Sequence, residues 1–339
     1  MSIKRPDIIA ELSCNHLGSL ERALALVDAA KYCGADGIKI QCWEPNRMVV
    51  DRSYVLPDGP WAGRNLFDLY EEAHTPWDWI PKIFNRAKQH NLRRIASVFD
   101  TEALRYLQEM DTPCYKIASF ELVDLPLIEA VRETGKPIIL STGMADDLEV
   151  WQALRASGMH AQPPRDITLL HCISAYPAPP VTMRLTQIPY MRETFGVPVG
   201  LSDHSVGIAA AVAATALGAT MIEKHFTLAR ANGGPDAAFS IEPDELSELV
   251  NATQEAHDAM IMIPTTDHDP IEEPQRRLRR SLYWARDIQP GETIQAGDMT
   301  TARPAQGLKP CEAHRVLGKT LHGPPIKAGT PVAAWEGIK

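Results

Sequence analysis

The sequence alternates short apolar runs with helix-like segments, and this alternation restricts the possible fold more than any other feature. Strand-like apolar runs lie at residues 8–12, 37–41, 94–99, 114–117, 137–140, 167–171, 197–201 and 220–223. Helical patterns occur at residues 20–33, 76–91, 101–109, 125–133, 148–157, 207–217 and 243–260. Eight β-α units within roughly 250 residues predict an α/β fold of the TIM (β/α)8 barrel type. A doubly wound open sheet is the competing fold, but the glycine-rich first turn typical of it is missing.

Beyond the eighth run the pattern changes, which predicts a second domain. We expect the barrel to occupy residues 1–262, with a linker of prolines and mixed charges at 263–278. Residues 279–339 contain short strand-like pieces at 281–288, 292–294, 299–302 and 331–334, separated by Pro-Gly, Ala-Gly and Gly-Pro turns. They predict a small β-rich domain. The connection 43–65 is unusually long and carries Trp43 and Trp61, so we expect it to be a lid or binding loop.

Charge and composition argue against several functional classes. The formal net charge is −9, and the basic stretch at 276–280 is short, so a nucleic-acid-binding surface is not expected. No signal peptide is recognised, and no apolar run approaches the roughly 20 residues of a membrane span. The six cysteines lack CxxC spacing, which indicates reduced thiols in a cytoplasmic protein.

Two histidines, His204 and His225, follow the seventh and eighth apolar runs. Because parallel strands joined by a helix start on the same side of a sheet, both histidines should emerge at its carboxyl edge. Either histidine alone would more often be a buried, hydrogen-bonded residue. Together, with Asp203 and Glu223 beside them, they predict a site for Mn, Zn, Fe, Co or Ni. Ser205 is the predicted N-cap of the next helix, whose dipole would disfavour protonated His204.

The other strand ends are polar as well. They carry Glu11, Lys39, Gln41, Ser97, Lys116, Ser119, Glu121, Ser141, His171, Ser174, Tyr176 and Ser202. Each unsatisfied buried polar group costs about 1–3 kcal/mol, so their convergence predicts an active site. The lysines and serines suit an anion that carries both phosphate and carboxylate, and Glu11 is a candidate general base or water-orienting group. Alternatively, Lys39 and Lys116 form ion pairs that cap the barrel. A second functional alternative is that Lys116 is the Schiff-base lysine of an aldolase.

A series of motifs resembles one known family over essentially the whole chain. The motifs are, in order, IIAELSCNH, GIKIQ, YKIASFE, ILSTGM, GLSDHS, IEKHF and GGPDAAFS, followed by RRSLYWARDIQPGETI and RPAQGLKP. In this combination the chain resembles the sialic acid (nonulosonic acid) synthase family. The resemblance implies a phosphoenolpyruvate-condensing TIM barrel followed by an antifreeze-like (SAF) domain. It also implies a domain-swapped homodimer, in which the small domain of one subunit closes the partner's active site.

The resemblance further implies roles for individual residues. It places a divalent metal, usually Mn²⁺, on His204 and His225, which act in catalysis with Glu11. The implied phosphoenolpyruvate contacts are Lys39, Ser97, Lys116, Ser119, Ser141 and Ser202. The implied sugar contacts are Gln41, Tyr176, Glu223 and Asp236, together with Arg303 from the partner's small domain. An ordinary surface cation is the other interpretation of Arg303.

Several details favour the pseudaminic acid synthase branch of the family. They are Leu-Ser after Glu11, Phe120, Ser174 where asparagine is usual in the sialic branch, and Ala-Phe-Ser ending at Ser240. This branch condenses phosphoenolpyruvate with 2,4-diacetamido-2,4,6-trideoxy-L-altrose, which gives pseudaminic acid and phosphate. The alternative is an N-acetylneuraminate or legionaminic acid synthase that uses an N-acetylmannosamine-type sugar. A non-enzymatic alternative, an inert barrel carrying a carbohydrate- or ice-binding module, leaves the polar strand ends unexplained. Val98 departs from the family, where proline usually follows the hydroxyl residue.

Overall fold

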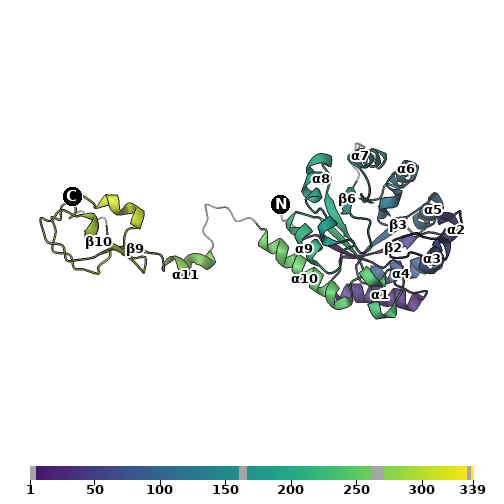
Figure 1. The fold of residues 1–339 in the computed structure, drawn as a ribbon, viewed down its shortest axis with the longest axis horizontal. Helices are drawn as coiled ribbons and strands as arrows, with labels where there is room; N and C mark the ends of the chain where they lie inside the picture. The colour runs from purple at the N-terminus through teal and green to yellow at the C-terminus, as the bar shows by residue number, and fades with distance from the viewer. Residues whose placement is uncertain (1–4, 160–165, 262–269, 334–336) are drawn as a thin grey trace. The chain divides into compact units, whose positions relative to one another are not determined.

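The computed structural model describes residues 5–159, 166–261, 270–333 and 337–339. It divides into two compact units, Met1–Ile261 and Met262–Lys339. The first unit is a closed barrel of eight parallel strands in sequence order, surrounded by helices (Figure 1). Its strands are β1 (Asp7–Glu11), β2 (Gly37–Cys42), β3 (Arg93–Val98), β4 (Tyr115–Ile117), β5 (Ile138–Ser141), β6 (Ile167–Cys172), β7 (Val199–Asp203) and β8 (Met221–His225). The predicted TIM barrel is confirmed.

The helices of this unit alternate with the strands, as the periodicity predicts. They are α1 (Leu20–Tyr32), α2 (Pro45–Met48), α3 (Leu66–Ala73), α4 (Ile80–Gln89), α5 (Thr101–Glu109), α6 (Leu125–Glu133), α7 (Asp147–Ala156), α8 (Gln187–Phe195), α9 (Ala209–Ala216) and α10 (Pro243–Ala259). Many begin at a carboxylate cap. The Asp100 side chain accepts two backbone N–H groups at the start of α5, and Asp146 and Glu149 form a capping box at α7. Such caps satisfy N–H groups that have no partner within the helix.

The start of α9 differs from expectation. Ser205 was predicted to cap this helix, but α9 begins at Ala209 and its N-cap position is Ile208. The Ser205 hydroxyl instead donates to Asp203 Oδ1 at 2.6 Å, in a turn that closes directly after β7. His204 therefore lies in this turn rather than at the helix N-terminus.

Strand register determines which side chains are neighbours at the mouth of the barrel. Register partners in adjacent parallel strands point to the same side of the sheet. Glu11 is level with Lys39 on one side and His225 on the other. Ser97 is level with Gln41 on one neighbouring strand and with Lys116 on the other. Ser202 is level with Glu223.

The opposite end of the barrel has an apolar filling. A cluster of buried side chains lies inside it, formed by Ile9, Ile95, Cys114, Ile139, Leu170 and Met221. Gly200 permits close packing here, because a Cβ at this position would lie 2.3 Å from the Met221 carbonyl oxygen. A larger apolar cluster joins the outer faces of the strands to the helices. The barrel is thus a packed core, and polar groups gather at its carboxyl end.

The second unit is small and rich in turns. Its sheet pairs β9 (Ser281–Trp284) with β10 (Met299–Ala302) in antiparallel register. The core contains Leu282, Trp284, Ile288, Ile294, Val316, Leu321, Val332 and Ile338. Residues 263–269 of the predicted linker lie outside the described residues; from 270 the chain forms short helical turns, η6 (Pro270–Glu272) and α11 (Glu273–Arg276).

None of the helices described has both the length and the apolar character required to span a bilayer.

Candidate active site

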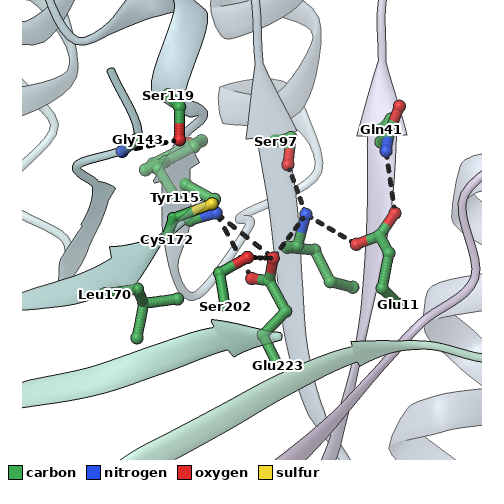
Figure 2. Close-up of polar contacts among 12 residues, drawn as sticks. Glu11, Gln41, Ser97, Tyr115, Ser119, Gly143, Leu170, Cys172, Ser202 and Glu223 are labelled. Carbon is green, nitrogen blue, oxygen red and sulfur yellow. Dashed lines mark hydrogen bonds and ion pairs between the residues drawn. The ribbon is translucent and has the colours of Figure 1, made fainter. Parts of the chain in front are cut away.

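Two lysines and two glutamates form a buried charge cluster at the carboxyl end of the barrel (Figure 2). Lys39 Nζ lies 2.6 Å from Glu11 Oε2, donates to Ser97 Oγ at 3.0 Å, and lies 3.5 Å from Glu223 Oε1. Lys116 Nζ approaches the other oxygen of Glu223 at 3.3 Å. The Glu223 carboxylate therefore links the two ammonium groups. All four charged side chains are at most 5% exposed.

The charges in this cluster hold one another in the ionised state. Burial raises the pKa of Glu223, but the two lysines outweigh it and lower the pKa to about 2. Burial lowers the pKa of Lys39, whereas Glu11 and Glu223 raise it above its ordinary value. The pKa of Lys116 is lowered, because burial and the nearby Lys39 outweigh the attraction of Glu223. Lys116 is thus the less fully compensated cation of the two.

Two hydroxyl groups near the carboxyl ends of β5 and β6 lack hydrogen-bond partners. The oxygens Ser141 Oγ and Ser174 Oγ are buried without a hydrogen-bond partner among the described residues. Gly143 N donates to Ser119 Oγ at 3.1 Å. A Cβ at Gly143 would lie 2.2 Å from Ser174 Oγ and 2.8 Å from Ser119 Oγ, so glycine keeps this space open. Unused hydroxyl donors at the same barrel mouth as two buried lysines suit a phosphate group.

Glu121 is a further carboxyl group at the mouth. It ends the short helical turn η2 (Ser119–Glu121) after β4, and its Oε2 is buried without a hydrogen-bond partner in the described chain. Burial raises its pKa to about 7. A carboxyl group with this pKa can give or take a proton near neutral pH.

The two histidines meet on the opposite side of the mouth. The ring centroids of His204 and His225 are 5.6 Å apart. His204 Nδ1 lies 2.9 Å from the Ile173 carbonyl oxygen, and its Nε2 lies 3.5 Å from Ser202 Oγ. His225 Nδ1 lies 3.4 Å from Asp236 Oδ2. Asp236 in turn accepts a hydrogen bond from Ser13 Oγ at 2.5 Å.

This arrangement fits a metal ion, although the two imidazoles do not complete a ligand set. Among the residues described, no group of three or more His, Cys, Asp or Glu side chains is arranged to hold a metal. The Nδ1–H of His204 can donate to the Ile173 carbonyl, which leaves Nε2 with a free lone pair. Asp236 lies at ion-pair distance from His225 Nδ1, which makes no hydrogen bond to the described residues. Substrate oxygens or water would have to supply the remaining ligands.

One expectation about His204 is wrong. Its pKa is raised rather than lowered. Burial alone lowers this pKa, but the combined effect of Cys172, the Ile173 carbonyl and Glu223 is larger and raises it. The physical reason is that α9 begins only at Ala209, so the expected helix N-terminus does not act on this ring.

The lid also reaches the site. Trp61, from the connection between β2 and α3, donates its Nε1–H to the Pro235 carbonyl at 2.9 Å. Its ring lies 5.6 Å from that of Tyr176 and 6.3 Å from that of Phe239. Tyr176 stacks over His204 at 4.2 Å, and Phe239 meets His225 edge to face at 5.1 Å.

The barrel thus brings together thirteen of the fourteen residues that were predicted for the site, all in the mouth or the loops around it. They are Glu11, Lys39, Gln41, Ser97, Lys116, Ser119, Ser141, Tyr176, Ser202, His204, Glu223, His225 and Asp236. Gln41 joins them by donating its amide to Glu11 Oε1 at 3.0 Å. Arg303 is exposed directly after β10, in the other unit.

Some predictions at the strand ends were incomplete. His171 bonds the Met183 carbonyl oxygen at 2.6 Å and is a structural residue. Gly143 and Phe239 were not among the predicted site residues, because their role depends on contacts between separate loops. Ser174 was predicted only as a polar strand end, and Trp61 only as part of the lid or binding loop. Glu121 was predicted as one of the polar strand ends, but no individual role was assigned to it.

Comparison with protein families gives two matches along the chain. The model of the NeuB family matches residues 26–262, and that of the SAF domain matches residues 279–334. The two matches correspond to the barrel and to the small β-rich unit.

Individual proteins give similar results. The pseudaminic acid synthase of Campylobacter jejuni is 39% identical over 319 residues, which cover 93% of this chain and 92% of the relative. The pseudaminic acid synthase of Helicobacter pylori is 37% identical over 339 residues, with 98% of each chain covered. The crystal structure of N-acetylneuraminic acid synthetase from Leptospira borgpetersenii superimposes with a TM-score of 0.71 at 29% identity. That match covers 80% of this chain and 90% of the other.

Proposed function

Because the chain belongs to the NeuB family, we propose that it is a pseudaminic acid synthase. It condenses phosphoenolpyruvate with 2,4-diacetamido-2,4,6-trideoxy-L-altrose and releases pseudaminic acid and phosphate. The resemblance expected from the sequence motifs is confirmed by the family match and by relatives that align over nearly the whole chain. The enzyme is therefore a phosphoenolpyruvate-dependent nonulosonic acid synthase.

One observation supports the proposal: two buried lysines and unpaired hydroxyl groups share the barrel mouth with an imidazole pair. Lys39, Lys116 and the hydroxyls around Gly143 suit the carboxylate and phosphate of phosphoenolpyruvate. Ser202 Oγ connects the two halves of the site, since it donates to Glu223 Oε1 at 3.1 Å and lies 3.5 Å from His204 Nε2. An aldehyde held near the imidazoles would thus face the bound enol phosphate.

The reaction forms one carbon–carbon bond and breaks one carbon–oxygen bond. C3 of phosphoenolpyruvate attacks the sugar aldehyde, and the aldehyde oxygen takes a proton. Water then adds to the cationic C2, and phosphate leaves with the bridging oxygen. Glu11, held by Lys39 and Gln41, orients the water, while Glu121 accepts and returns a proton near neutral pH. Ser119, Ser141 and Ser174 stabilise the departing phosphate.

His204 and His225 are the residues that would hold the divalent metal, which we propose is Mn²⁺. Their two nitrogens, with Asp236 and the Ile173 carbonyl orienting the rings, match imidazole coordination. When bound, the ion would supply Lewis-acid polarisation of the aldehyde. Gln41, Tyr176, Glu223 and Asp236 are the proposed contacts to the sugar.

We further propose that the active enzyme is a domain-swapped homodimer, in which the partner subunit's small domain supplies Arg303. Exposed apolar side chains on the loops around the barrel mouth support this arrangement, because they offer a surface that another chain can cover. They are Phe120, Val123, Met144, Val181 and Val206, each at least 60% exposed. The cytoplasm, which contains phosphoenolpyruvate, is the proposed location.

Sugar specificity tests the assigned reaction. Purified enzyme should release phosphate from phosphoenolpyruvate with 2,4-diacetamido-2,4,6-trideoxy-L-altrose at least about tenfold more efficiently than with its D-manno isomer or N-acetylmannosamine. Mass spectrometry of the product would identify pseudaminic acid. A higher kcat/KM for N-acetylmannosamine or for the D-manno sugar would assign the chain to the sialic or legionaminic branch instead.

The Schiff-base alternative has its own test. The lowered pKa of Lys116 is compatible with an aldolase lysine. Borohydride reduction in the presence of pyruvate or phosphoenolpyruvate should leave Lys116 unmodified in a condensing synthase. A trapped adduct on this lysine, found by peptide mass spectrometry, would contradict the proposed mechanism.

A further inference from the structure

Three aromatic rings from separate loops form a wall above the histidine pair. Trp61 comes from the connection after β2, Tyr176 from that after β6, and Phe239 from the short helical turn η5 (Ala237–Phe239) after β8. Tyr176 and Phe239 are 5.1 Å apart, and Trp61 lies within 6.3 Å of both. These three side chains are called the aromatic wall below.

The aromatic wall has little hydrogen-bonding capacity left for a ligand. The one polar hydrogen of Trp61 is used by the Pro235 carbonyl. Phe239 has no polar atom, and the Tyr176 hydroxyl lies at the edge of its ring, not on the ring face. The indole and phenyl faces therefore suit a group without hydroxyls, and their negative faces disfavour an anion. This excludes the wall as a contact for phosphoenolpyruvate and assigns it to the sugar.

The depth of the site indicates which end of the sugar meets the wall. Lys39 and Lys116 are at most 3% exposed and lie deep in the barrel, so bound phosphoenolpyruvate lies deep as well. The aldehyde carbon must face it to be attacked. Tyr176 and Phe239 contact the histidine rings near the aldehyde, so the opposite end of an open-chain hexose extends towards the half-buried Trp61 at the rim.

We infer that Trp61, the ring of the aromatic wall that does not contact the histidines, binds the C6 methyl group of the sugar and selects for 6-deoxy substrates. This inference rests on the proposed function, because it concerns the same site and sugar. The wall makes the enzyme distinguish a methyl group from a hydroxymethyl group at C6. Apolar pockets discriminate against one added hydroxyl by about 10- to 100-fold, which sets the preference expected here.

A matched pair of sugars tests the inference. They are 2,4-diacetamido-2,4,6-trideoxy-L-altrose and the same sugar carrying a hydroxyl at C6. Wild-type enzyme should prefer the 6-deoxy sugar by about 10- to 100-fold in kcat/KM. Trp61→Ala should reduce this preference at least fivefold and raise the KM of the deoxy sugar. The KM of phosphoenolpyruvate should change less than threefold.

Trp61→Phe separates contact by the ring from anchoring of the loop. It keeps an aromatic face but removes the hydrogen bond to Pro235, so it should retain the preference within threefold. Tyr32→Ala, an exposed ring on α1, is the control and should behave as wild type. Equal use of both sugars by the wild type, an unchanged preference in Trp61→Ala, or a loss in Trp61→Phe equal to that in Trp61→Ala would overturn the inference. Activity confined to N-acetylmannosamine would instead show that the proposed function itself is wrong.

Discussion

Lys224 Nζ lies 2.8 Å from Asp203 Oδ2, and both residues are 1% exposed. The two residues are register partners in β7 and β8, directly before His204 and His225 in the sequence. Lys224 also donates to the Ser205 carbonyl at 2.7 Å, and Asp203 accepts the Ser205 hydroxyl. This ion pair joins the ends of the two strands that carry the imidazoles.

Breaking the pair should destabilise the barrel. Lys224→Met leaves Asp203 buried without its cation, so the free energy of unfolding should fall by about 3–5 kcal/mol. The double variant Asp203→Asn with Lys224→Met removes both charges, and Asn Oδ1 can still accept from Ser205. It should recover at least half of the loss in urea denaturation. Equal losses in the single and double variants would contradict an ion-pair effect.

Glu223 should give the protein a stability component that disappears in acid. Its pKa is lowered to about 2 in the folded protein. Ionised Glu223 therefore stabilises the fold at any pH above its ordinary pKa, which is near 4.5. This stability is lost as pH falls from about 4.5 to about 2, by an amount on the order of 3 kcal/mol. Glu223→Gln should be less stable than wild type at pH 7 and should change less over the acid range. Parallel pH profiles of unfolding for the two proteins would contradict the prediction.

Glu121 should give the folded protein a pH dependence of stability opposite to that of Glu223. Because burial raises its pKa to about 7, the folded state binds a proton more tightly than the unfolded state, and stability decreases as pH rises from about 4.5 to about 7. Glu121→Gln should remove this decrease, on the order of 1–3 kcal/mol, and should also remove an inflection near pH 7 from kcat/KM. Glu133→Gln, at an exposed carboxylate on α6, is the matched control. An inflection that persists in Glu121→Gln would assign the proton transfer to another group.

Metal content should depend on both imidazoles. Chelation should lower activity by more than about 100-fold, and added Mn²⁺ should restore it. His204→Ala and His225→Ala should each contain less metal by elemental mass spectrometry and should show weaker Mn²⁺ binding by electron paramagnetic resonance. The exposed His314 provides a control through His314→Ala. Full metal content in both site variants would remove the proposed metal role.

Mixed dimers test the proposed role of Arg303. Arg303→Ala should raise the KM of the sugar by about 10- to 100-fold, because a charge-assisted hydrogen bond is worth about 1.5–3 kcal/mol, and should spare the KM of phosphoenolpyruvate. Mixing Arg303→Ala with His204→Ala subunits should regain activity. In a swapped dimer, one site of each mixed pair has both an intact barrel and the partner's intact arginine. After random exchange about one quarter of the sites should be active. No recovery after demonstrated exchange would place Arg303 outside the partner's site.

Much of the barrel followed from periodicity, since its strands are mostly apolar runs with polar residues at or near their carboxyl ends. β10 and the helices α5 and α6 have the predicted bounds. The helix α8 was not predicted, because Pro189 and a mixed pattern of apolar residues obscure its period. Ser205 has the chemistry of an N-cap, but a tertiary partner, Asp203, binds its hydroxyl. Val98, where the family usually has proline, is an ordinary buried strand residue paired with Cys42.

Contacts between loops were beyond prediction from the sequence. Trp61 and Phe239 lie far apart in the chain, and no local pattern indicates that their rings meet. The open space at Gly143 depends in the same way on Ser174, which belongs to a different loop. By contrast, the polar strand ends were predictable, because strand order and register are properties of the barrel itself.

The apolar cluster inside the barrel also determines how substrates reach the site. It consists of Ile9, Ile95, Cys114, Ile139, Leu170 and Met221. They fill the interior of the described barrel at the end opposite the site. Both reactants therefore enter, and both products leave, through the carboxyl end. In the proposed arrangement phosphoenolpyruvate lies deeper than the sugar, so we expect it to bind first. This order of binding follows from the six buried residues that close the far end of the barrel.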